Sequence, residues 1–229
     1  MKERPIIMSA FSVRALFHGT KTVTRRVVKP QPPYLLGLQR MWGTSPPPNP
    51  VAFGTPGHFR IVGADYPDDA RDDRYCPYGA PGDRLWVKET WWPRTGDKRR
   101  SEVLYRATDW ASIGDGVAWK SSLFMPRWAS RLTLEIVDER AEPLGKLTRE
   151  EAWKEGMAQH CEGCALGRDH HECKGCFDAV GRYRELWQEL NGKKYPWSSE
   201  LWVWVLETRI VEDCTMRPHS RQRATEARA

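Results

Sequence analysis

The feature that most limits the possible fold is a continuous apolar run near the end of the chain, LWVWVLE at residues 201–207. A strand-length run of this kind is typical of a central strand that is covered on both faces. Such a strand needs neighbouring strands beside it and other elements packed above and below it. The rest of the chain therefore has to supply a sheet and the segments that cover it.

Further segments predict strands. Apolar residues alternate with polar or larger aromatic residues over 83–92 and again over 131–139, as in half-buried strands. Residues 103–107 have the same character. The valines of 23–28 favour an extended segment that a Lys-Pro pair ends.

Three segments predict helices. Ser9 is placed to cap a short helix that Gly19 can terminate. A capping box at 148–151 opens a helix that ends near Glu155, and apolar residues recur at helical spacing over 177–190. Strands interspersed with helices, without regular βαβ alternation, predict an α+β fold, a small mixed β-barrel with flanking helices.

The 229 residues suit one elaborated domain, which we expect to span 1–216. Proline, glycine and like charges fill residues 31–82 and predict a long surface insertion that could cover an active site. A second insertion is expected at 158–177. The arginine-rich tail, 217–229, is expected to be disordered.

The second insertion contains two C-x-x-C pairs, Cys161 with Cys164 and Cys173 with Cys176. Two such turns present four thiolates at tetrahedral geometry, which fits zinc better than an iron–sulfur cluster. Four sulfur ligands leave no open position for water, so the predicted zinc is structural. The other two of the six cysteines are expected to be ordinary thiols.

The net charge of +6 and the isoelectric point near 9.0 suit a polyanionic partner such as RNA or DNA. The alternative is a solvated basic surface without a partner. No run approaches the about 18 apolar residues of a membrane span, and the first residues lack the apolar core of a secretion signal. We therefore expect a cytoplasmic protein that does not bind membranes.

Several segments together resemble one family. They are GTKTVTRR, PGDRLWVKETW, MPRWASRLTLEI, LTREEAWKEGM and ELWVWVLE. They resemble ASCH-domain proteins of bacteriophages and prophages, some of which are described as phage morphogenetic proteins. The resemblance implies a PUA-like barrel and a role in RNA binding or processing. A small branch of the family hydrolyses N(4)-acetylcytidine to cytidine and acetate.

The resemblance also implies site residues. In that branch a G-x-K-x-x-T pattern and a glutamate from a later helix form the site, and they correspond here to Lys21, Thr24 and Glu155. Glu150 or Glu151 could take the place of the glutamate. Amide hydrolysis needs a nucleophile, a base and an acid, which these side chains could supply. Because positions 21 and 24 point to opposite faces of a regular strand, the chain has to bend there.

Basic residues mixed with tryptophans suit base stacking and phosphate contacts. The candidates for nucleic-acid or ligand binding are Arg14, Arg25, Arg26, Glu89, Trp91, Arg127, Trp128 and Arg131. By contrast, we expect Trp86, Trp202 and Trp204 to be core residues, because they are embedded in apolar strands.

These observations leave three functions open. The first is an enzyme that removes the acyl group from N(4)-acylated cytidine, or a ribonuclease. The second is a module that reads a modified or single-stranded base in RNA or DNA without chemistry. The third is a role in phage assembly, which rests only on the description of some similar proteins.

Overall fold

The structure is a computed structural model. It describes residues 1–29, 31, 51–53, 58–62, 72–94, 103–113, 117–157 and 178–213. The four cysteines of the predicted zinc site, the tail 217–229 and most of 31–82 lie outside these residues, so the zinc site and the tail stay predictions.

The described residues form a five-stranded main sheet with strand order β1-β6-β9-β10-β2. The strands are β1 (Glu3–Ile7), β6 (Arg84–Lys88), β9 (Leu132–Pro143), β10 (Trp202–Asp213) and β2 (Val23–Val27). The β1–β6 pair is parallel and the other pairs are antiparallel. The sheet is therefore mixed, as the sequence predicted.

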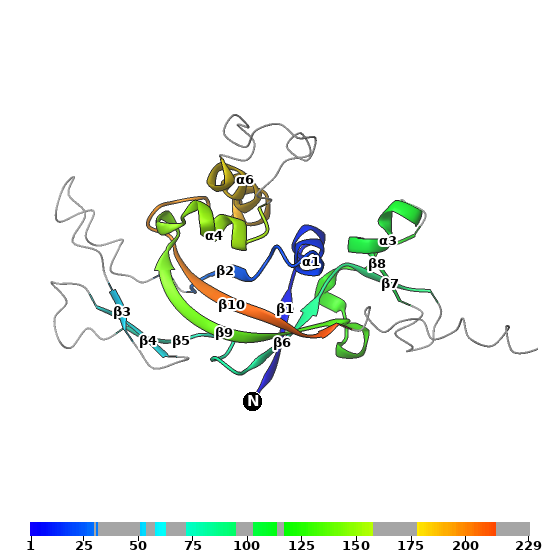
Figure 1. Ribbon diagram of the computed structural model, residues 1–229, viewed down its shortest axis with the longest axis horizontal. Helices are drawn as coiled ribbons and strands as arrows, with labels where there is room; N and C mark the ends of the chain where they lie inside the picture. The colour runs from blue at the N-terminus through cyan, green and yellow to red at the C-terminus, as the bar shows by residue number, and fades with distance from the viewer. Residues whose placement is uncertain are drawn as a thin grey trace, which may run out of the picture.

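The predicted closed barrel is not found among the described residues, because the end strands β1 and β2 do not pair with each other there. The long strands β9 and β10 curve across the molecule (Figure 1). Register shifts between Glu207 and Thr208 and between Ile210 and Glu212 accompany this curvature, since a bulge bends a strand. The result is a curved mixed sheet with two free ends in the described part of the chain.

The predicted helices are present. They are α1 (Ala10–Phe17), α4 (Arg149–Lys154) and α6 (Ala179–Asn191). The hydroxyls of Ser9 and Thr148 accept from the backbone N–H groups three residues later, at 3.2 and 3.3 Å, and cap α1 and α4. Gly19 follows α1 with a φ of 68°. Figure 1 shows α1, α4 and α6 on one side of the curved sheet.

The segment 83–92, predicted as one strand, is divided between two sheets. β6 belongs to the main sheet, whereas the last residues form a hairpin-like pair with a later strand. These strands are β7 (Trp91–Pro93) and β8 (Val103–Tyr105). The chain then enters the helix α3 (Arg106–Ile113), which the sequence analysis did not predict.

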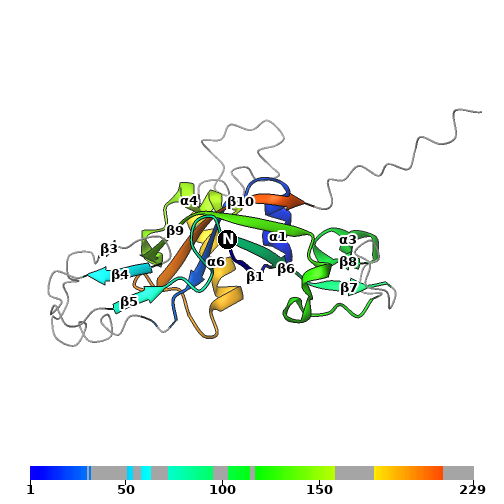
Figure 2. The same cartoon turned by 90° about the horizontal axis from the view of Figure 1, so that it is seen from below.

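The region 31–82 also contains regular structure that its composition did not predict. Three short strands form a separate antiparallel sheet, namely β3 (Val51–Phe53), β4 (His58–Val62) and β5 (Asp72–Tyr75). Figure 2 shows this sheet at one end of the molecule and β7, β8 and α3 at the other end, with the main sheet between them.

The apolar run in β10 separates two cores, as its composition predicted. Trp204 and Leu206 face one core, which also includes residues of β1, β6, β9 and α1, and Val203 and Val205 face the other, beneath α4 and α6. Trp202 is also buried in the first core. Trp86 is not a core residue: it is half-buried, and the cations of Lys88 and Arg127 lie 5.5 and 6.0 Å from its ring centroid.

In the described part of the chain, no helix is both long enough and apolar enough to cross a lipid bilayer.

Candidate functional site

Two of the three residues implied by the resemblance lie in contact. Lys21 and Glu155 form an isolated antiparallel bridge, although they are 134 residues apart in the sequence. The Lys21 Nζ atom lies 2.5 Å from Glu155 Oε2, and the two residues are 5% and 3% exposed. The turn at Gly19 and the bond from Thr22 N–H to the Lys154 carbonyl bring the two segments together.

The ammonium of Lys21 is also bonded to the backbone. It donates to the carbonyl of Val23 at 2.7 Å and to the carbonyl of Glu155 at 3.1 Å, in addition to the Glu155 carboxylate. These contacts use all three of its donors. Because Glu155 ends α4, the ammonium also lies where the last carbonyls of that helix favour a cation.

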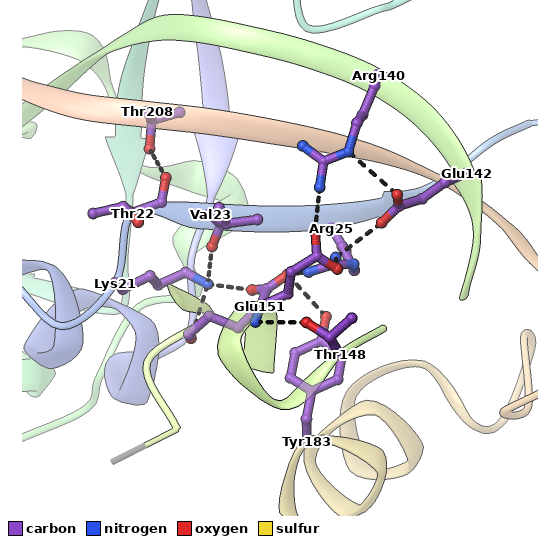
Figure 3. A network of polar contacts seen from close by, with 11 residues as sticks. Lys21, Thr22, Val23, Arg25, Arg140, Glu142, Thr148, Glu151, Tyr183 and Thr208 are labelled. Atoms are coloured by element: carbon purple, nitrogen blue, oxygen red, sulfur yellow. Dashed lines mark hydrogen bonds and ion pairs between the residues drawn. The ribbon is translucent and has the colours of Figure 1, made fainter. Parts of the chain in front are cut away.

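Arg25 extends this pair into a buried network (Figure 3). Its guanidinium contacts Glu155 at 3.4 Å, Glu142 at 2.9 Å and Glu151 at 2.6 Å, and its side chain is fully buried. Arg140, which is half-exposed, contacts Glu142 and Glu151 from β9. The network therefore joins β2, β9 and α4 through alternating positive and negative groups.

The surroundings shift the pKa values of three groups in this network. Burial lowers the pKa of Lys21, although the Glu155 carboxylate opposes this effect. Burial acts in the same direction on Arg25, but the carboxylates of Glu155 and Glu151 outweigh it and raise its pKa. Tyr183 donates its hydroxyl to Glu155 at 3.1 Å, and burial, with the charge of Glu155, raises the pKa of this phenol well above its usual value.

Thr24, the third residue implied by the resemblance, is buried but does not join this network. In the register of β2 and β10 it lies opposite Leu206, which faces the first core, whereas Arg25 lies opposite Val205, which faces the second. Within the described residues, Thr24 has no hydrogen bond to Lys21 or Glu155. The Lys21 ammonium nevertheless contacts the Val23 carbonyl, which belongs to the peptide unit that joins Val23 to Thr24.

The two alternative glutamates occupy different places. Glu150 is exposed on α4, and Glu151 binds Arg25 and Arg140 rather than Lys21. Of the three glutamates, Glu155 is therefore the one in contact with Lys21.

A second buried ion pair contains two other predicted site residues. The guanidinium of Arg131 binds the carboxylate of Glu89 through two contacts of 2.8 and 2.9 Å, and Glu89 is 1% exposed. Arg131 also lies over the ring of Tyr105, at 4.0 Å from its centroid. Burial raises the pKa of Glu89 in spite of this pairing. The predicted residue Trp91 is also buried nearby and packs edge-on against Trp128, with their rings 6.0 Å apart.

The remaining predicted residues lie closer to the surface. Arg14 and Arg26 donate to backbone carbonyls at 3.4 and 2.5 Å. Arg127 forms an exposed ion pair with Glu3 at 2.7 Å. The structure thus distributes the predicted ligand-binding residues over two buried ion-pair clusters and the surface, and does not gather them in one place.

Sequence reasoning missed several members of the Lys21 network. Tyr183 had the spacing of an ordinary core residue on α6, and Arg140 and Glu142 lie beyond the segment predicted as a strand. Their positions depend on the pairing of β9 with β10, where Glu142 lies opposite Val203. The one local signal was the adjacent arginines of the TRR motif, which required carboxylate partners wherever the strand buried one of them.

No family model matches the chain, and neither does any curated protein. Among solved structures, the chain is similar to a high-resolution crystal structure of an ASCH domain from Lactobacillus crispatus JV V101. The alignment covers 92% of this chain and 80% of that one, with 7% sequence identity and a TM-score of 0.37.

Proposed function

We propose that this chain handles a nucleoside or nucleic acid at a site centred on Lys21 and Glu155, and that it removes the acyl group from an N(4)-acylated cytidine. The contact between these two residues carries the proposal. The motif resemblance implied that a lysine before β2 and a glutamate at the end of a later helix act together, and in the fold they lie 2.5 Å apart.

The electrostatics of the pair suit amide hydrolysis. A lysine can take a proton from a nucleophile only as the neutral amine, and burial lowers the pKa of Lys21 in that direction. Glu155 and Tyr183 lie beside it, so proton donors and acceptors are held within hydrogen-bond distance of one another. The nucleophile would be Thr24, whose backbone adjoins the Lys21 contact.

The second candidate is a module that binds the same ligand without chemistry. Two observations favour it: Thr24 faces the other core, and the three donors of Lys21 are already bonded to protein oxygens. Hydrolysis requires the first residues of β2 to rotate so that the hydroxyl meets the amine, whereas binding requires no such change.

The deciding experiment is incubation with N(4)-acetylcytidine, both as the free nucleoside and within RNA, followed by mass spectrometry. We expect cytidine as the product and at least a hundredfold loss of rate, on the order of the contribution of a general base, in Lys21→Met. Lys154→Met is the matched control, since this exposed lysine ends α4 directly before Glu155 and its ammonium lies 3.9 Å from the Glu207 carboxylate.

The two candidates predict different results. Binding of the ligand without product by the wild-type protein would select the non-catalytic module. Full activity of a folded Lys21→Met variant would exclude Lys21 from the reaction, and an equal loss in Lys154→Met would show that the effect is not specific to the pair.

A further inference from the structure

A row of two cations and three tryptophans lies on the part of the molecule formed by β7, β8 and α3. The guanidinium of Arg106 lies 4.9 Å from the ring centroid of Trp110, and this ring lies 6.5 Å from that of Trp119. The next residue, Lys120, places its ammonium 5.7 Å from the ring of Trp92. Backbone hydrogen bonds between Lys120 and Trp91 fix this end of the row to β7. We refer to Arg106, Trp110, Trp119, Lys120 and Trp92 as the cation–tryptophan row.

The row is accessible from solvent. Trp110 is 37% exposed, Arg106 and Lys120 are exposed, and Trp92 and Trp119 are half-buried. A tryptophan that only fills a core has no need of a cation over an exposed ring face. The row therefore presents rings and positive charges together on one surface.

Basic side chains outnumber acidic ones in the segments that carry the row. Between positions 84 and 130 the described residues include six basic side chains, at 84, 88, 94, 106, 120 and 127, but only the acidic Glu89 and Asp109. Both acidic groups are engaged inside the fold, since Glu89 binds Arg131 and Asp109 accepts from the Tyr105 N–H at 2.7 Å. Arg127 is paired with Glu3, so the cations that the row itself offers to a partner are Arg106 and Lys120.

We propose that the cation–tryptophan row binds single-stranded nucleic acid. Unpaired bases stack on the indole rings, and the phosphates between them contact Arg106 and Lys120. Stacking on aromatic side chains combined with a basic track is how proteins hold single strands without reading their sequence. A duplex is a poorer ligand, because its bases are already stacked on one another.

This surface is separate from the site proposed above. Figures 1 and 2 both show α3, β7 and β8 at one end of the molecule and α4 away from it. Glu155 directly follows α4. The row needs no chemistry at Lys21, and the two proposals fail independently.

The test is fluorescence anisotropy with a short labelled oligouridylate, an oligothymidylate of equal length and a duplex, each at low and moderate salt. We expect tighter binding to the single strands than to the duplex, and affinity that falls with salt. Trp110→Ala should weaken binding of single strands roughly tenfold, the effect of losing one stacked base. Lys120→Ala should weaken it and also lower the salt dependence by about one counterion. The RNA and DNA arms distinguish which strand the surface prefers.

Two controls keep the test specific. Lys194→Ala removes another exposed lysine that lies over an aromatic ring, 5.7 Å from that of Tyr195, and should leave affinity unchanged. Trp110→Phe keeps an aromatic face and should retain most of the binding, even if Trp110→Ala fails to fold. Lack of binding by the wild-type protein would overturn the proposal. Wild-type affinity in folded Trp110→Ala and Lys120→Ala variants would also overturn it, as would equal affinity of the wild-type protein for single strand and duplex. Equal weakening by Lys194→Ala would do so too.

Discussion

Cys76 is a buried thiol in the first core, next to the carboxylate of Glu139 and the backbone of Tyr78. Burial, reinforced by Glu139, raises the pKa of this thiol from 9.0 to about 12. Between these two values the unfolded chain loses the thiol proton while the folded chain keeps it. The folded state then binds more protons, so stability falls as the pH rises through this window.

We therefore expect that replacement of this thiol makes the free energy of unfolding less dependent on pH in the alkaline range. Between about pH 8 and pH 10, the free energy of unfolding should fall by roughly 1.4 kcal/mol more in the wild type than in Cys76→Ser, because serine does not titrate there. Urea denaturation at several pH values measures both slopes. Parallel slopes for the two proteins would mean that the thiol has an ordinary pKa in the folded state.

For single residues, the sequence identified candidate site residues but did not predict which face of a strand their side chains occupy. Arg25 and Arg26 are neighbours in the same motif, and nothing local distinguishes them. Strand alternation sends Arg25 to the carboxylates under α4 and sends Arg26 to the carbonyl of Ile7. The face of each depends on the pairing of β2 with β10, a contact between distant segments that no local pattern encodes.

The end of α4 positions Glu155, and Gly156 makes that end possible. Gly156 has a φ of 94°, and a Cβ atom there would lie 2.7 Å from the Cβ atom of Ala15 in α1. Gly82 has a similar φ of 89°, but a Cβ atom there would meet nothing within 4 Å. An alanine at either position would therefore adopt a similarly unfavourable backbone conformation, but only at position 156 would it also meet a neighbouring helix.

Both Gly→Ala changes should cost about 1–2 kcal/mol in backbone strain. Gly156→Ala should cost a further 1–3 kcal/mol or so, because α1 and α4 have to move apart to relieve the contact. Thermal or urea unfolding of the two variants measures the difference. Equal losses would show that the approach of α1 to α4 is not tight.

Elements with local start and stop signals were predictable, whereas those defined by partners were not. The caps at Ser9 and Thr148 each bond as their sequence patterns predict, and both helices follow. By contrast, 83–92 alternates throughout, and its division into β6 and β7 follows from different partners, β9 for one and β8 for the other. The composition of 31–82 did not predict the sheet of β3, β4 and β5. These strands have only three to five residues, and the proline and glycine around them dominate the composition of the region.

Across the whole molecule, the buried network around Arg25 holds an edge strand in place. β2 pairs with β10 on one side only in the described sheet, and Arg25 adds contacts to Glu142 on β9 and Glu151 on α4. Arg140 contacts the same two carboxylates from the more exposed side. The two arginines thus bind shared partners at different depths.

Depth should decide how much each arginine contributes to stability. Arg25→Met removes a fully buried cation from three carboxylates, those of Glu142, Glu151 and Glu155, and should lower the free energy of unfolding by about 3–5 kcal/mol. Arg140→Met removes a cation that is 35% exposed, so it should cost no more than about 1 kcal/mol. Urea denaturation measures the two losses, provided that the free energy of unfolding falls with urea concentration at the same slope in both variants. A loss in Arg140→Met as large as that in Arg25→Met would mean that burial does not set the contribution of an arginine in this network.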